Sequence, residues 1–258
     1  MSRSAHVVDG DRVYGAWDTG GRILDYTTAA DTLTDALHLD RPPVGLAFVG
    51  AVPDAIPPLL HSAPSACSLW RSAEQQTFYA AANAHLNCPV GAMVMGFELP
   101  ESTHRELSGL AELMVGCRYL GADEVSRIPT VKSARAGIVY GPLRDFPVRA
   151  DLIVMWVSAR DAMLYAEAAG SCALTTSAPG GLLGRPACAA LPTALQNASP
   201  VLSLGCAGMR TFTEISDHRL MAVLPAQELD TFVAALAKTV EANATMQRAY
   251  DARRTLVG

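Results

Sequence analysis

The stretch HRLMAVLPAQELDTFVAAL, residues 218–236, contains the order of elements on which our prediction of the fold depends. Its apolar run predicts a strand, Pro225 ends that strand, and apolar residues at helical spacing then predict a helix. An earlier stretch, GAMVMGFELPESTHRELSGLAEL at 91–113, has the same order around Pro100. The two stretches together predict that one strand–helix unit occurs twice in the chain.

The rest of the chain contains further short apolar runs bounded by proline and glycine, and further segments with helical spacing. We expect strands at 44–49, 91–97, 151–157 and 218–224, helices at 28–39, from 67, at 100–120, at 159–169, from 188 and at 225–248, and loops at 83–89 and 171–186. Because no linker divides the chain, residues 1–258 are predicted to form a single domain. The predicted fold is α/β or α+β, with two degenerate strand–helix repeats, at 44–120 and 151–250, packed around a shared core.

The composition of the chain favours a folded protein that acts on small molecules. Half of the 258 residues are hydrophobic, 17% are charged, and the formal net charge is −5. An acidic chain of this kind is a poor match for nucleic acid, which requires a basic face. The first residues form no apolar signal segment, and the apolar runs are too short to span a membrane. We therefore expect a cytoplasmic protein without nucleic-acid or membrane partners, whose cysteines are reduced, catalytic or metal-bound.

Four of the six cysteines occupy matched positions in the two predicted repeats. Cys67 and Cys188 stand at predicted helix starts, and Cys88 and Cys206 stand in the segment before the strand of each repeat. If the repeats pack around a pseudo-twofold axis, equivalent positions face each other. We therefore expect these four thiols to converge on one site and to hold a metal centre.

The spacing of the four cysteines favours an iron–sulfur cluster over a zinc module. The pairs are 21 and 18 residues apart, and the chain contains no Cys-x-x-Cys pair of the kind that zinc ribbons use. Ligands that come singly from separate segments are typical of a cluster held between two halves of a fold. A [4Fe-4S] cluster is the preferred cofactor, zinc is the alternative, and haem is the least favoured because no Cys-x-x-Cys-His is present. The other two cysteines, Cys117 and Cys172, are expected to be inert.

Three polar residues near these cysteines are candidates for chemistry. Arg71 and Arg210 each follow a candidate ligand by four residues, so each could position an anionic group of a substrate. His85 precedes Cys88 in a polar segment and could move a proton or replace one cysteine as a ligand. The alternatives are a surface ion pair for each arginine and an ordinary loop hydrogen bond for the histidine.

Four short motifs together resemble the family catalogued as domain of unknown function 169. They are Cys-x-x-Trp-Arg at 67–71, His-x-x-Cys-Pro-x-Gly at 85–91, Arg-Pro-x-Cys at 185–188 and Gly-Cys-x-Gly-x-Arg at 205–210. The resemblance covers the chain from about 40 to 240, and every motif cysteine is present. Since the members of this family are uncharacterised bacterial and archaeal proteins, the resemblance implies no substrate. It implies that the four motif cysteines act as one functional unit.

The sequence therefore predicts a cysteine-ligated metalloenzyme that acts on a small, anionic molecule as a lyase, hydrolase or desulfurising enzyme, in secondary metabolism. Two alternatives stay open at this point. One is a small-molecule-binding protein in which zinc joins the two halves. The other is a metal-free enzyme whose nucleophile is Cys67, because a helix N-terminus lowers the pKa of a thiol. A homodimer is compatible with each of these functions.

Overall fold

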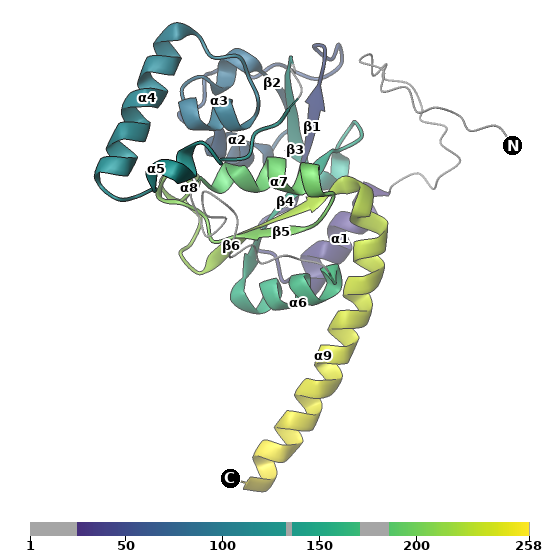
Figure 1. Ribbon diagram of the computed structural model, residues 1–258. Helices are drawn as coiled ribbons and strands as arrows, with labels where there is room; N and C mark the ends of the chain where they lie inside the picture. The colour runs from purple at the N-terminus through teal and green to yellow at the C-terminus, as the bar shows by residue number, and fades with distance from the viewer. Residues whose placement is uncertain (1–24, 133–135, 171–185, 258) are drawn as a thin grey trace, which may run out of the picture.

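A six-stranded antiparallel sheet forms the centre of the protein. The computed structural model describes residues 25–132, 136–170 and 186–257 (Figure 1). The strands are β1 (Val44–Val49), β2 (Phe78–Ala81), β3 (Gly137–Pro142), β4 (Leu152–Ser158), β5 (Val201–Ser203) and β6 (Arg219–Pro225). They lie in the order β2-β3-β1-β4-β6-β5, and neighbouring strands pair antiparallel throughout. Helices combined with an antiparallel sheet make this an α+β fold, in agreement with the predicted class.

Both faces of the sheet are buried, because alternate residues of each strand point into two different cores. In β4, Leu152, Val154 and Trp156 belong to one core, whereas Ile153, Met155 and Val157 belong to the other. Strands covered on both faces are expected to be apolar along their whole length. This is why VGLAFV at 44–49 could be identified as a strand from the sequence alone.

The helices form one layer on each face of the sheet. One layer, which we call the cysteine layer, consists of α2 (Ala66–Ala73), α3 (Pro89–Val94), α7 (Ala190–Asn197) and α8 (Ala207–Thr213), with the turn η3 (Ala187–Ala189) before α7. The opposite layer consists of α1 (Tyr26–Ala36), α6 (Ala159–Ala169) and the first part of α9 (Leu229–Val257). All four candidate ligands therefore belong to the same side of the sheet.

Two helices extend away from these layers. In Figure 1, α4 (Glu101–Gly116), with the short α5 (Ala122–Val125) after it, lies at one edge of the cysteine layer, and the far end of α9 projects from the body. The remaining short turns are η1 (Ala82–His85), η2 (Leu143–Asp145) and η4 (Ala226–Glu228). Among helices in the described ranges, none is both long enough and apolar enough to cross a bilayer.

The strand predicted at 91–97 is wrong, because this apolar run forms helix α3 and the turn that follows it. Pro89 occupies the first helical turn, and Gly96, with φ +75°, ends the segment. A short apolar run buried on all sides cannot be assigned to helix or strand by periodicity. The chain from 78 to 81, predicted as a continuation of the helix from Cys67, is strand β2, and strand β3 was not predicted.

The internal repeat predicted at 44–120 and 151–250 is not confirmed, since its matched strand at 91–97 is a helix. The sheet order nevertheless has a symmetry of its own. If β1 is exchanged with β4, β2 with β5 and β3 with β6, the strand order becomes β5-β6-β4-β1-β3-β2. This is the original order counted from the other edge of the sheet. We call residues 44–142 the first half and residues 152–225 the second half. In this correspondence β3, not the segment at 91–97, matches β6.

Candidate functional site

The four candidate ligands all lie at the starts of helical segments in the cysteine layer. Cys67 is the second residue of α2, and Cys88 immediately precedes α3. Cys188 lies in the turn η3 that leads into α7, and Cys206 immediately precedes α8. The first backbone N–H groups of a helix have no partner within the helix, so they favour negative charge nearby. Thiolates placed at these ends would be stabilised by that field.

Local sequence explains why helices start at these cysteines. Ser65 caps α2: its hydroxyl accepts a hydrogen bond from Ser68 N at 3.2 Å, and the Ser68 side chain accepts one in return from Ser65 N. Proline in the first turn favours the start of α3. At α8 the cysteine is itself the cap, because Cys206 Sγ accepts a hydrogen bond from Met209 N at 3.4 Å. This thiol is already oriented toward the helix end.

The four thiols are close enough to affect one another electrostatically. Burial raises the pKa of the Cys67 thiol well above its ordinary value, and charge at each of the other three cysteines raises it further. Burial also raises the pKa of the Cys188 thiol, and charge at Cys88 and Cys206 raises it further. Residues that are far apart in the sequence are thus brought into one neighbourhood. Whether they bind a metal together stays a prediction.

A close approach of α3 to α2 brings Cys88 to this neighbourhood. A Cβ atom on Gly91 would lie 2.5 Å from Ala66 Cβ and 3.0 Å from Cys88 Sγ. Only glycine fits at this contact, because real Cβ atoms do not come so near to another side chain. The glycine of the predicted His-x-x-Cys-Pro-x-Gly motif therefore has a packing role beside the thiols.

The thiols are not closed around a single ion. Within residues 25–132, 136–170 and 186–257, no group of three or more His, Cys, Asp or Glu side chains is arranged to hold a metal ion. Four thiolates at about 2.3 Å from one zinc ion would have sulfurs about 3.8 Å apart.

His85 lies in the first half of the cysteine layer, buried and hydrogen-bonded through both ring nitrogens. Nδ1 is 2.9 Å from the Ala81 carbonyl oxygen, and Nε2 is 3.0 Å from the Tyr140 hydroxyl. A carbonyl can only accept, so Nδ1 carries the proton and Tyr140 donates to Nε2. Burial lowers the pKa of His85 to about 4. His85 is therefore neutral, and it could ligate a metal only by giving up one of these bonds.

Tyr140 is a site residue that the sequence reasoning missed. It lies on β3, it is fully buried, and it belongs to the same core as Cys67 and Cys188. Burial raises the pKa of its hydroxyl well above the ordinary value, and the charges of these two cysteines raise it further. The run GIVYG at 137–141 contained the signal, because a tyrosine in an apolar strand must bury its hydroxyl beside a partner.

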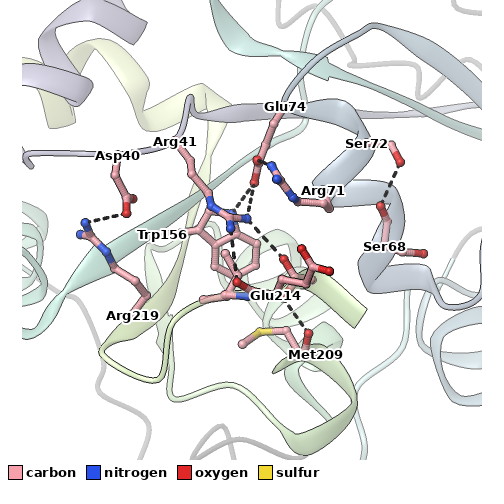
Figure 2. A network of polar contacts seen from close by, with 12 residues as sticks. Asp40, Arg41, Ser68, Arg71, Ser72, Glu74, Trp156, Met209, Glu214 and Arg219 are labelled. Carbon is pink, nitrogen blue, oxygen red and sulfur yellow. Dashed lines mark hydrogen bonds and ion pairs between the residues drawn. The ribbon is translucent and has the colours of Figure 1, made fainter. Parts of the chain in front are cut away.

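Arg71 turns to a buried carboxylate. Its guanidinium pairs with Glu74, which also accepts hydrogen bonds from Arg41 at 3.4 Å and from Trp156 Nε1 at 3.1 Å. In Figure 2 the two arginines approach Glu74 from opposite sides. Because Glu74 is 8% exposed, a carboxylate there needs such partners. In this structure Arg71 therefore forms an ion pair, which the sequence offered as the alternative to a substrate-positioning role.

Arg210 holds the loop around α8 together. Its guanidinium donates to three backbone carbonyls, those of Leu204 at 2.8 Å, Ser216 at 3.1 Å and Arg219 at 3.2 Å. An ion pair with Asp217 at 3.7 Å completes its surroundings. These bonds hold in place the segment that contains Cys206, so Arg210 has a structural role in the cysteine layer.

Trp70 has the one buried side-chain nitrogen or oxygen without a hydrogen-bond partner in the part of the chain that the structure describes. Its side chain is fully buried, and its ring centroid is 6.2 Å from that of Trp156. Trp70 follows Cys67 by three residues, so the two side chains share a face of α2. A buried N–H without a partner costs about 1–3 kcal/mol.

Cys117 and a cavity beside α1 lie apart from these thiols. Cys117 was expected inside an apolar helix face, but it is exposed at the end of α4. Cys172 and the proline- and glycine-rich segment around it lie outside the described residues. A cavity of about 290 Å³ is lined by α1, by the segment from Leu39 to Pro43 and by Arg144, and contains none of the candidate site residues.

Comparison with known proteins finds one family and nothing else. The model of the domain of unknown function 169 family, described as "Uncharacterised ArCR", matches residues 32–235. No curated protein and no solved structure matches the chain. The matched residues include the four cysteines of the cysteine layer, and the description of the family assigns no activity.

Proposed function

The chain belongs to the domain of unknown function 169 family, and from this premise we propose that it is a cysteine-ligated metalloenzyme that acts on a small molecule. Cys67, Cys88, Cys188 and Cys206 hold its centre, a [4Fe-4S] cluster. The reaction is that of a lyase, a hydrolase or a desulfurising enzyme, in the cytoplasm and in secondary metabolism. Because the family description names no activity, the proposal rests on the residues of this chain.

The observation that carries the proposal is the placement of four cysteines from separate segments in one layer, where three of the thiols act on the fourth. Charge at Cys88, Cys188 and Cys206 raises the pKa of Cys67 in a site that burial already makes unfavourable for thiolates. Cys67 and Cys188 are buried and Cys88 and Cys206 are partly buried, so the four thiols need a cation among them to ionise together. Iron or zinc would supply that charge and would deprotonate its ligands on binding.

The origin of the four thiols in four separate segments favours a cluster over a compact zinc module. A cluster of several irons separates its ligand sulfurs further than one ion does, and its ligands are cysteine thiolates. The same burial works against a free nucleophile, because it keeps the Cys67 thiol protonated.

The residues around the thiols have roles that follow from their contacts. An iron with an open coordination position supplies a Lewis acid. Tyr140 and His85 form a hydrogen-bonded pair of polar groups in the same layer as the first-half thiols. Arg210 orders the segment before α8 through backbone carbonyls. Arg71 is partly exposed and could turn from Glu74 toward an anionic substrate.

Metal analysis of anaerobically purified protein tests the proposal. We expect iron and acid-labile sulfide in near-equal amounts, a brown colour, and loss of most of the iron in Cys188→Ser. The matched control is Cys117→Ser, because that cysteine is exposed at the far end of α4. It should retain the iron of the wild type.

Each other outcome contradicts the proposal in a recognisable way. Colourless protein with stoichiometric zinc would support the alternative in which zinc joins the two halves. Protein without metal, inactivated by alkylation of one cysteine, would support the metal-free enzyme. Iron that survives Cys188→Ser unchanged would remove Cys188 from the site.

A further inference from the structure

Two polar side chains beside the first-half thiols, Trp70 and Tyr140, have apolar counterparts in the second half. Trp70 follows Cys67 by three residues, and Leu191 follows Cys188 by three. Tyr140 stands two residues before the end of β3, and Val223 stands two residues before the end of β6. In each comparison the first half has a hydrogen-bonding side chain where the second half has an apolar one.

The indole N–H of Trp70 differs from the other buried polar groups of this core because it lacks a hydrogen-bond partner in the described chain. The Tyr140 hydroxyl donates to His85 Nε2 at 3.0 Å, and Trp156 Nε1 donates to Glu74 at 3.1 Å. Trp70 Nε1 is buried without an acceptor in the described chain. An indole N–H can only donate, so whatever completes this site must offer an acceptor.

We propose that Trp70 Nε1 donates a hydrogen bond to a sulfur of the metal centre, so that Trp70 is a positioning residue. This inference rests on the proposed four-thiolate site. Cys67 and Trp70 are neighbours on one face of α2, both are buried in the same core, and thiolates or sulfides are acceptors. The equivalent Leu191 can make no such bond.

The proposal predicts that Trp70→Phe weakens the metal-loaded protein but not the metal-free protein. In the empty protein, Trp70→Phe removes an N–H that has no partner, so this part of the change costs nothing. In the loaded protein it removes a hydrogen bond to the centre. Outer-shell hydrogen bonds of metal sites contribute about 10- to 100-fold to metal affinity. Hydrogen bonds to sulfur also tune the reduction potential of a cluster.

The experiment compares Trp70→Phe with Trp156→Phe in protein reconstituted anaerobically with iron and sulfide. The control residue is a second fully buried tryptophan of the same core, and its N–H is already bonded to Glu74. We expect Trp70→Phe to lose iron to a chelator about 10- to 100-fold faster than wild type and to shift the reduction potential downward. Trp156→Phe should match wild type in both measurements.

Every outcome decides for or against the proposal. If Trp70→Phe and Trp156→Phe both match the wild type in iron retention and in reduction potential, the role of Trp70 is overturned and the proposed function stands. A wild type that takes up no iron would overturn both. Equal effects of the two variants would show general loosening of the core, which also contradicts a specific bond from Trp70.

Discussion

At the scale of single residues, burial decides what His85 can do. The sequence presents a histidine in a polar segment near a cysteine, which predicts a proton donor or a ligand. In the structure its ring is 1% exposed, and both nitrogens are hydrogen-bonded. Because water is excluded, the charged form is disfavoured. The residue is thus a neutral anchor for Tyr140 at neutral pH.

The lowered pKa of His85 predicts a specific pH dependence of stability. The pKa is about 4 in the folded chain, against 6.5 ordinarily. Below pH 6.5 the unfolded chain binds a proton that the folded chain refuses, so stability is complete above pH 6.5 and falls toward pH 4. At pH 5 the loss is about 2 kcal/mol. Urea denaturation at pH 7 and pH 5 measures it.

Two variants identify the source of this loss. In His85→Gln the difference between pH 7 and pH 5 should shrink by about 2 kcal/mol. His104, which is exposed on α4, provides the control, and His104→Gln should keep the wild-type difference. An unchanged pH dependence in His85→Gln would contradict the assignment.

At the scale of elements, the contact between α2 and α3 positions Cys88. This contact depends on Gly91, where a Cβ would lie 2.5 Å from Ala66 Cβ. A methyl group in this place must push the two short helices apart, since the clash is with another Cβ and not with a flexible side-chain end. Overpacking of this kind costs about 1–3 kcal/mol.

Gly91→Ala is therefore expected to lower the free energy of unfolding by about 1–3 kcal/mol and to reduce metal content. The matched control is Gly208→Ala in α8, where a Cβ would meet nothing within 4 Å. That variant should gain about 0.5–1 kcal/mol, because alanine favours a helix over glycine. Chemical denaturation measures both values. Equal stability of the two variants would show that the close approach of α2 and α3 does not matter.

At the scale of the whole molecule, α9 has two parts with different environments. Leu229, Phe232 and Leu236 are buried against the sheet layer, whereas residues 244–255 are exposed. Figure 1 shows the end of α9 projecting from the body. A helix that has few apolar contacts gains little from tertiary packing. The stability of the protein should therefore depend on the first part of α9 and not on the second.

Removal of residues 245–258 is expected to change the free energy of unfolding by less than about 0.5 kcal/mol, as for exposed positions in general. Phe232→Ala, in contrast, should cost about 3–5 kcal/mol because it leaves a cavity in the core. Thermal or urea unfolding of the two proteins makes the comparison. A large loss on truncation would indicate that the projecting part of α9 has a partner in solution.

Several parts of this architecture could be predicted from the amino-acid sequence alone. VGLAFV and DLIVMWV form buried strands, and the helix at 159–169 has the predicted bounds, because continuous apolar runs and helical spacing are local signals. The choice of four cysteines among six also came from the sequence, through their matched order. In the structure these four lie in one layer, and Cys117 lies apart from them.

Other features depended on the tertiary structure. GAMVMGF became a helix, since its surroundings and not its composition decided between helix and strand. The partners of Arg71 and Arg210 are close in the sequence, but those of Tyr140 and of Arg41 are not: His85 bonds the tyrosine of β3, and Glu74 at the end of α2 accepts from Arg41. Hydrogen bonds and burial of this kind depend on how elements pack, because local sequence does not encode which distant group a side chain will meet. Sequence order therefore predicted which four cysteines share one layer, and packing decided which polar groups surround them.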